Sequence, residues 1–208
     1  MTRNIQTNSE ERILKAAEEL FLAKGYASTK TTQIAEKAGV THAMLHYYFR
    51  TKEHLFDHIV NKKMQFIFNS ISQPLSNNEC SFSERIKNII EAHFDFLTEN
   101  PNLPRFLINE VLTNKEHCNS MLEKITPMIN LMASSLQNEA NRATEKGEIE
   151  SINVKMLMLD IISLNVMTFI TFPFFDSVFP SSEEQKNIFL AARKTENITL
   201  ILKRIQKI

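Results

Sequence analysis

The chain has 208 residues, of which 24 are lysine or arginine and 24 are aspartate or glutamate, so its formal net charge at pH 7 is zero. That balance excludes a protein that coats nucleic acid by bulk positive charge. A hydrophobic content of 43% excludes the disordered and fibrous classes, and a total of three glycines excludes glycine-rich nucleotide-binding loops.

The cysteines and the apolar runs indicate in which cellular compartment we expect the protein. Cys80 and Cys118 lack CxxC or metal-ligand spacing, so we expect free thiols in a reducing compartment. The first nine residues carry no apolar run, which predicts no signal peptide and a cytoplasmic location. The uncharged apolar run 161–175 has 15 residues, fewer than the roughly 20 that span a bilayer, so we expect a buried helix and no membrane contact.

The first quarter of the chain reads as four helices. Ser9 and the acidic residues after it predict the start of the first helix, and Lys24-Gly25 predicts its end. Thr31 or Thr32 can cap a second helix that stops at Gly39. Two further starts follow: Thr41 can cap a third helix over 42–49, and a fourth begins near Thr51.

The rest of the chain also reads as helices. The polar stretch 73–79 interrupts the apolar periodicity and is the best candidate boundary. Beyond it we expect helices over 82–97, 106–113, 116–146 with an interruption near Pro127, and 154–172, the last apolar nearly all round and therefore buried. A connection over 173–180 precedes a final helix, whose capping-box start is Ser181-Ser-Glu-Glu.

Residues 30–49 have the proportions of a helix-turn-helix, in which the second helix enters the major groove of DNA. Two helices that cross closely need a small residue at the contact, and Ala35 can supply it. The turn needs a residue that tolerates positive φ, and Gly39 can supply that. Val40 and Leu45 can then seal the second helix onto the first.

Three stretches carry a resemblance to a known family. They are Ile13-Leu-Lys-Ala-Ala-Glu-Glu-Leu-Phe-Leu-Ala-Lys-Gly25-Tyr, Thr31-Thr-Gln-Ile-Ala-Glu-Lys-Ala-Gly-Val40 and Leu45-His-Tyr-Tyr-Phe49-Arg-Thr-Lys-Glu-His-Leu55. In order and without gaps, they resemble the N-terminal domain of the tetracycline-repressor (TetR) family of bacterial transcriptional regulators over roughly residues 9–63. The resemblance implies an all-α fold, with a three-helix helix-turn-helix DNA-binding domain in residues 1–63 and a helical ligand-binding and dimerisation domain in residues 64–208.

The resemblance also implies a set of DNA-contacting residues. Thr31 would bind a phosphate with Thr32 beside the groove, and Lys52 would grip another phosphate. The start of the recognition helix would face base edges and backbone: Thr41, His42, Ala43, Met44, His46, Tyr47 and Tyr48. Met44 stands where the family often has a small hydroxyl residue and His46 where it often has tyrosine, so the operator sequence does not follow by analogy.

Other interpretations compete at several of these residues. His42/His46 and His54/His58 have the i, i+4 spacing of metal ligands but lack the HExxH arrangement, so we expect no metal. Tyr47 and Tyr48 can either pack or reach phosphate, and Phe49 is expected in the core.

Apolar and polar residues of the second domain are candidates for a ligand pocket, although aromatic and methionine residues at helical spacing more often belong to a plain core. The candidates are His93, Phe94, Phe106, Asn109, Met128, Met132, Asn165, Phe169 and Phe172. The polar members can orient a ligand or satisfy one another.

The charge is unevenly divided. Residues 1–63 contain ten lysines and arginines and seven acidic residues, a net charge of +3, which leaves −3 for the remainder.

The expected function is a homodimeric transcriptional regulator, a repressor released from a near-palindromic DNA operator by a small hydrophobic inducer, without a cofactor. The alternatives are an all-helical enzyme and a protein-binding adaptor; no nucleophile or paired-carboxylate motif supports an enzyme.

Overall fold

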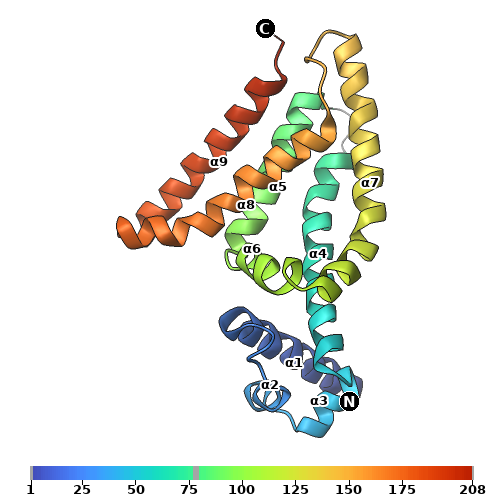
Figure 1. The fold of residues 1–208 in the computed structure, drawn as a ribbon, viewed down its shortest axis with the longest axis vertical. Coiled ribbons are helices and arrows are strands. Elements are labelled where there is room, and N and C mark those ends of the chain that lie inside the picture. Colours follow the sequence, from blue (N-terminus) through green and yellow to red (C-terminus); the bar gives the residue numbers. More distant parts are fainter. Residues whose placement is uncertain (1, 77–79, 208) are drawn as a thin grey trace. The chain divides into compact units, whose positions relative to one another are not determined.

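The computed structural model describes residues 2–76 and 80–207, and it describes side chains for residues 9–71 and 80–207. Helices dominate, and no strand occurs in these ranges (Figure 1), which confirms the all-α expectation. The chain forms two compact units: Met1–Gln65 with Arg105–Lys124, and Phe66–Pro104 with Ile125–Ile208. Residues 105–124 therefore group with the N-terminal unit, although the sequence-based division puts them in the second domain.

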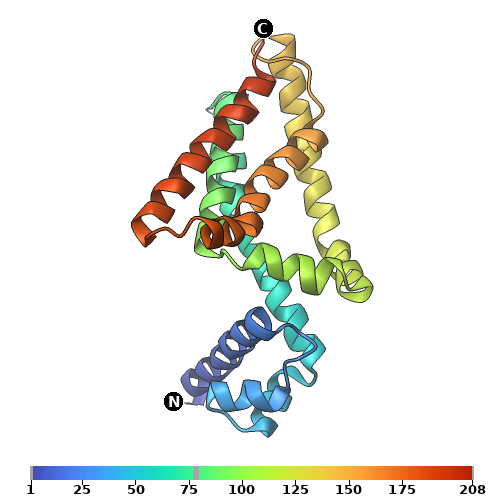
Figure 2. The ribbon, with the colours of Figure 1, turned by 60° about the vertical axis from the view of Figure 1, so that its left-hand side comes forward.

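The first unit begins with a small helical bundle (Figure 2). Its helices are α1 (Thr2–Lys24), α2 (Thr31–Ala38), α3 (His42–Phe49) and the first half of α4 (Lys52–Ser76). Ile13 and Phe21 of α1 are fully buried, and the Phe21 ring meets that of Phe56 edge-on at 5.5 Å. Burial of such side chains contributes about 1.5–3 kcal/mol each, so this apolar core holds the short helices α2 and α3 in place.

The ends of the short helices differ in part from expectation. Gly39 terminates α2 with a φ of +63°, and Ala35 is buried where α2 contacts its neighbours, as predicted. Thr41 is confirmed as the N-cap of α3, because its Oγ1 accepts a hydrogen bond from the Met44 N–H at 3.1 Å. The predicted caps of α1 and α2 are wrong: α1 begins at Thr2 rather than after Ser9, and Lys30 rather than a threonine is the N-cap of α2.

The segment after residue 102 returns to the first unit. It consists of α6 (Leu103–Phe106), the π-helical turn η1 (Leu107–Leu112) and the start of α7 (Lys115–Glu145). The buried His117 ring stacks on Phe56 with centroids 4.4 Å apart, and Phe106 packs on the same phenyl ring at 5.5 Å. Phe56 therefore joins the N-terminal bundle to a segment about fifty residues further along the chain.

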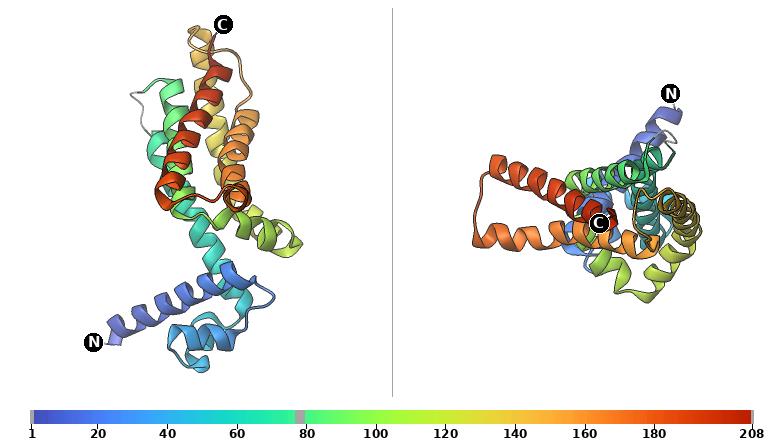
Figure 3. Two further views of the ribbon diagram at one scale, coloured as in Figure 1. Left: turned by 90° about the vertical axis from the view of Figure 1, so that its left-hand side faces the viewer. Right: turned by 90° about the horizontal axis from the view of Figure 1, so that it is seen from above.

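The second unit packs α5 (Phe82–Glu99) against both α8 (Val154–Val178) and α9 (Glu183–Ile205), as Figures 1 and 3 show. Its apolar core includes Ile86 and Ile90 of α5, Leu157 of α8 and Ile201 of α9, all buried. Phe94 and Phe169 extend this packing with ring centroids 5.2 Å apart.

Two prolines stand inside helices where we expected interruptions. Helix α7 continues through Pro127, and α8 continues through Pro173 as far as Val178, so both predicted breaks are wrong. Packing along a long helix offsets the hydrogen bond that a proline removes.

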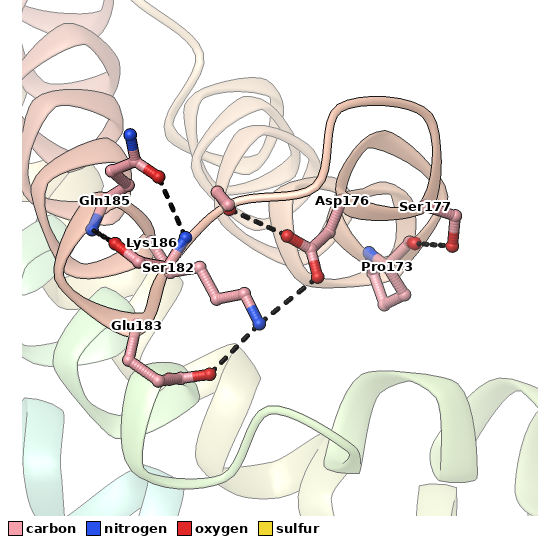
Figure 4. A network of polar contacts seen from close by, with 8 residues as sticks. Pro173, Asp176, Ser177, Ser182, Glu183, Gln185 and Lys186 are labelled. Carbon is pink, nitrogen blue, oxygen red and sulfur yellow. Dashed lines mark hydrogen bonds and ion pairs between the residues drawn. The ribbon is translucent and has the colours of Figure 1, made fainter.

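A polar network holds the turn between α8 and α9 (Figure 4). The Lys186 ammonium lies 3.2 Å from Asp176 and 3.0 Å from Glu183, and the Ser181 hydroxyl donates to Asp176. These contacts hold the pKa of the Asp176 carboxyl below its usual range, chiefly through the Ser181 hydrogen bond. The cap of α9 is formed by Ser182 with Gln185, one residue later than predicted.

Within one chain, helix α8 is buried on one side only. Residues such as Leu157 and Asn165 face the core, whereas Met156, Leu159 and Ile162 are exposed. Its 25 residues also exceed the predicted 15-residue run, and by length and composition alone α8 is the helix among the described residues that could cross a membrane. An apolar core or interface helix meets the same criterion.

Candidate nucleic-acid interface

Helix α3 is anchored by two apolar side chains. Leu45 and Phe49 are buried, one turn apart, and they hold the inner side of the helix against the bundle. The remaining surface of α3 is available for contact: His42, Ala43, Met44, His46 and Tyr47 are exposed. The helix thus has the arrangement required of a recognition helix, a buried inner face and an open outer one.

Tyr47 and Tyr48 have different environments. Tyr47 is 74% exposed, which is unusual for so large an aromatic side chain. Tyr48 is half-buried, and its ring meets that of Tyr47 edge-on at 5.4 Å. The two outcomes left open by the sequence are therefore divided between the residues: Tyr47 is free to contact a partner, while Tyr48 also packs.

Thr31 contacts the recognition helix directly. Its Oγ1 lies 3.0 Å from Nε2 of His42, so the first residue of α2 is hydrogen-bonded to the first residue of α3. Thr32, the next residue, is exposed. The N–H of the α2 cap residue Lys30 donates to the side-chain oxygen of Gln33, and the Thr31 hydroxyl therefore contacts α3 rather than capping its own helix.

Lys52 forms hydrogen bonds within the N-terminal unit. Its ammonium donates to the carbonyl oxygens of Tyr26 at 2.9 Å and Thr29 at 3.1 Å, and it lies 4.2 Å from the centroid of the Tyr26 ring. An ammonium has three N–H donors, so one remains for a phosphate. The structure gives Lys52 a part in holding the loop between α1 and α2, which sequence reasoning did not foresee.

Arg50 is a further cation beside α3 that the sequence analysis did not single out. It is exposed and has a φ of +51° and a ψ of −53°. The Thr51 N–H donates to the Phe49 carbonyl, so residues 49–51 form a tight γ-turn with positive φ, a strained conformation for a residue with a side chain. A basic residue directly after the predicted recognition helix was the available sequence signal.

Four of the predicted pocket residues are brought together in the second unit. His93 and Phe94 come from α5, and Asn165 and Phe169 come from α8. Asn165 Nδ2 lies 3.3 Å from His93 Nδ1 and donates to the Ile90 carbonyl at 3.2 Å. Burial lowers the pKa of His93 to about 4, so the imidazole is neutral and can accept this bond.

Asn197 of α9 joins this polar group, which sequence reasoning missed. It is fully buried, and its Nδ2 donates to Asn165 Oδ1 at 2.9 Å. Its own Oδ1 is buried and accepts no hydrogen bond from the residues that the structure describes. An asparagine at a core position of an amphipathic helix was the available signal, but the sequence could not show which helix it faces.

The other predicted pocket residues are dispersed. Phe106 packs on Phe56 in the first unit, and Phe172 stacks on Phe189 at 5.2 Å. Asn109 and Met128 are exposed. Met132 lies partly buried against the apolar core.

Among the residues that the structure describes, the histidine pairs are not part of a larger set of metal-binding side chains. The rings of His42 and His46 lie 6.4 Å apart. Within the described ranges, no three His, Cys, Asp or Glu side chains are grouped so that they could hold a metal ion.

A capped helix with an exposed outer face, set against a second short helix across a positive-φ glycine turn, defines a helix-turn-helix protein. Residues 13–59 match the sequence profile described as bacterial regulatory proteins, tetR family. The match begins in α1 and ends in α4, so it includes the helix-turn-helix of α2 and α3.

Curated relatives and solved structures agree with the match. The chain is 26% identical over 114 residues to the nucleoid occlusion factor SlmA of Pasteurella multocida, covering 55% of this chain and 57% of that protein. It is 25% identical over 149 residues to the fatty acid metabolism regulator protein of Bacillus subtilis, covering 70% and 73%. The matches to the first curated relatives span little more than half of their length.

The fold extends over nearly the whole chain. The structure of the ketosteroid transcriptional regulator KstR2 of Mycobacterium tuberculosis superposes with a TM-score of 0.70 and 15% identity, covering 96% of this chain and 95% of that one. At this identity the likeness concerns the fold alone.

Proposed function

We propose that this chain is a DNA-binding transcriptional regulator, a repressor that a small hydrophobic ligand releases from a near-palindromic operator. The observation that carries the proposal is the exposed outer face of α3, with Tyr47 at its centre. A helix anchored by Leu45 and Phe49 can enter the major groove without exposing the core.

The DNA contacts we propose follow from exposure and chemistry. His42 and His46 can hydrogen-bond base edges, and Met44 can contact a thymine methyl group. Thr31 and the third N–H of Lys52 can bind phosphates. Ala43, Thr41, Thr32, Tyr47 and Tyr48 complete the proposed surface, Arg50 adds a cation beside it, and the +3 charge of residues 1–63 favours DNA.

We propose a homodimer formed through α8 and α9. Met156, Leu159 and Ile162 form an exposed apolar stripe on α8, and Ile188 is 62% exposed on α9. Apolar surface of this extent is a common feature of protein interfaces. A second copy that covers it would give a dimer with two recognition helices, which we propose enter successive major grooves, whose centres are about 34–36 Å apart.

The ligand is proposed to be apolar. Phe94 and Phe169 pack beside the neutral group of His93 and Asn165, so this region has little charge to offer an ionic ligand. The name of one similar protein, a fatty acid metabolism regulator, also supports an apolar class. Release would follow from the ligand's preference for a conformation that the operator does not fit.

Fluorescence anisotropy tests the proposal. A labelled duplex, selected from a random-sequence library by the purified chain, should bind specifically and more weakly as salt rises. Tyr47→Ala should reduce the affinity several-fold, while Glu11→Ala, an exposed position on α1, should not. Failure to select any duplex over unrelated DNA would contradict the proposal and favour an all-helical enzyme or a protein-binding adaptor.

A further inference from the structure

The contact between Thr31 and His42 suggests how one base is read. Oγ1 of Thr31 and Nε2 of His42 are 3.0 Å apart, although the residues begin two different helices. We propose that Thr31 is a positioning residue that holds His42 in a single tautomer, so that His42 Nδ1 accepts a hydrogen bond from the amino group of an adenine or cytosine. This inference rests on the function proposed above.

Both ends of the His42 side chain are constrained. Its backbone belongs to the first turn of α3, which Thr41 fixes through the hydrogen bond from Met44 N–H to Thr41 Oγ1. Its ring is held at Nε2 by Thr31. Because both Cα and Nε2 are held, the ring has little freedom to rotate, and the remaining nitrogen, Nδ1, is the atom that can contact a base.

The protons available to the Thr31 hydroxyl and the His42 ring determine which tautomer His42 adopts. A threonine hydroxyl has one proton to donate, and a phosphate oxygen is a stronger acceptor than a neutral imidazole nitrogen. When Thr31 donates that proton to a DNA phosphate, its oxygen can only accept, so Nε2 of His42 must carry a proton. Nδ1 of the neutral ring then bears the lone pair.

A lone pair at Nδ1 limits what His42 can read. In the major groove the donors are the N6 amino group of adenine and the N4 amino group of cytosine, whereas guanine N7 and O6 and thymine O4 are acceptors. The pair of Thr31 and His42 therefore matches an amino group and rejects an acceptor at the same place. Without the hydroxyl, both tautomers become accessible and the distinction is lost.

The experiment uses the duplex selected by the parent protein, at pH 8. His42→Ala identifies the contacted base pair as the one whose replacement no longer affects affinity. At that position the amino group is then deleted, with 2′-deoxynebularine for adenine or 2′-deoxyzebularine for cytosine. For an adenine, 7-deazaadenine, which lacks N7 but keeps the amino group, is the matched control.

Deletion of the amino group should weaken binding by the parent about tenfold, while loss of N7 should have little effect. Thr31→Val should remove this sensitivity, Thr31→Ser should restore it, and Thr31→Val with His42→Ala should lose no more discrimination than His42→Ala alone. All these residues are on the surface or half-buried, so the variants should fold.

Three results would overturn the inference. One is sensitivity to N7 rather than to the amino group, because it would mean that Nδ1 donates. Another is a contacted position where only an acceptor matters, and the third is a Thr31→Val variant that binds all DNA more weakly but keeps the parent's discrimination. If the parent selects no duplex at all, the proposed function fails first, and that outcome is distinct from these three.

Discussion

Glu110 Oε2 accepts a hydrogen bond from the backbone N–H of Tyr26 at 2.9 Å, although the two residues are 84 positions apart. Glu110 lies in the π-helical turn η1, and its backbone carbonyl contacts Nδ1 of the buried His117 at 2.9 Å. Tyr26 meets the His117 ring edge-on at 5.0 Å. The loop between α1 and α2 is thus tied to a segment that follows α5 in the chain.

A side chain at Gly25 would displace the Glu110 carboxylate from this contact. Gly25 has a φ of +80°, and a Cβ there would lie 2.7 Å from Glu110 Oε1. Gly147 has a similar φ of +74°, but its Cβ would lie 3.5 Å from the flexible Lys207 Nζ. Gly147→Ala should therefore cost about 1 kcal/mol in free energy of unfolding for backbone conformation alone, and Gly25→Ala about 1 kcal/mol more. Equal losses in urea unfolding would contradict the steric part of this prediction, which Glu110→Ala in the Gly25→Ala background should relieve.

Lys52 should contribute to stability as well as to DNA binding. Lys52→Met removes two hydrogen bonds to carbonyl oxygens and the contact with the Tyr26 ring, so we expect a loss of about 1–2 kcal/mol in the free energy of unfolding. Lys30→Met is the control, because the Lys30 side chain is exposed, and it should change stability by less than about 0.5 kcal/mol. If the two variants unfold at the same urea concentration, Lys52 has no structural part.

At position 50, the glycine variant should be more stable than the alanine variant, which is the reverse of the usual order. At an ordinary position glycine is less stable than alanine by roughly 0.5–1 kcal/mol, because glycine loses more backbone entropy on folding. At the positive φ of Arg50, the side chain itself causes strain. Arg50→Gly should therefore be more stable than Arg50→Ala by about 1 kcal/mol in urea unfolding. Both variants should bind DNA equally weakly, since each lacks the guanidinium; a less stable glycine variant would exclude strain at this turn.

His93 should make stability depend on pH. Burial lowers its pKa from 6.5 to about 4 in the folded protein, so the unfolded chain takes up this proton first as the pH falls. Stability from this group is complete above about pH 6.5 and decreases between pH 6.5 and 4. Melting temperatures of the parent should therefore fall more steeply through this window than those of His93→Gln, which keeps an acceptor for Asn165. Parallel pH profiles of the two proteins would argue against a neutral His93.

Much of the fold and of the candidate site could be read from local sequence. Helix positions follow from apolar periodicity and from residues such as Thr41 and Gly39, whose effects act within one turn of the chain. The helix-turn-helix is made of such local signals, whereas its DNA-contacting residues were implied by the resemblance to the TetR family and stay a prediction. Pro127 and Pro173 misled the prediction because packing of the whole helix outweighs one lost hydrogen bond.

Only the tertiary structure decided which distant residues meet. The net charge of zero was set by composition, and its division into +3 and −3 could be counted along the chain. The use of Lys52 on the α1–α2 loop, the bond from Tyr26 to Glu110 and the burial of Asn197 beside Asn165 depend on helices packed from separate parts of the chain. Local propensity acts over a few residues, whereas these contacts exist only once the apolar faces of the helices are buried together.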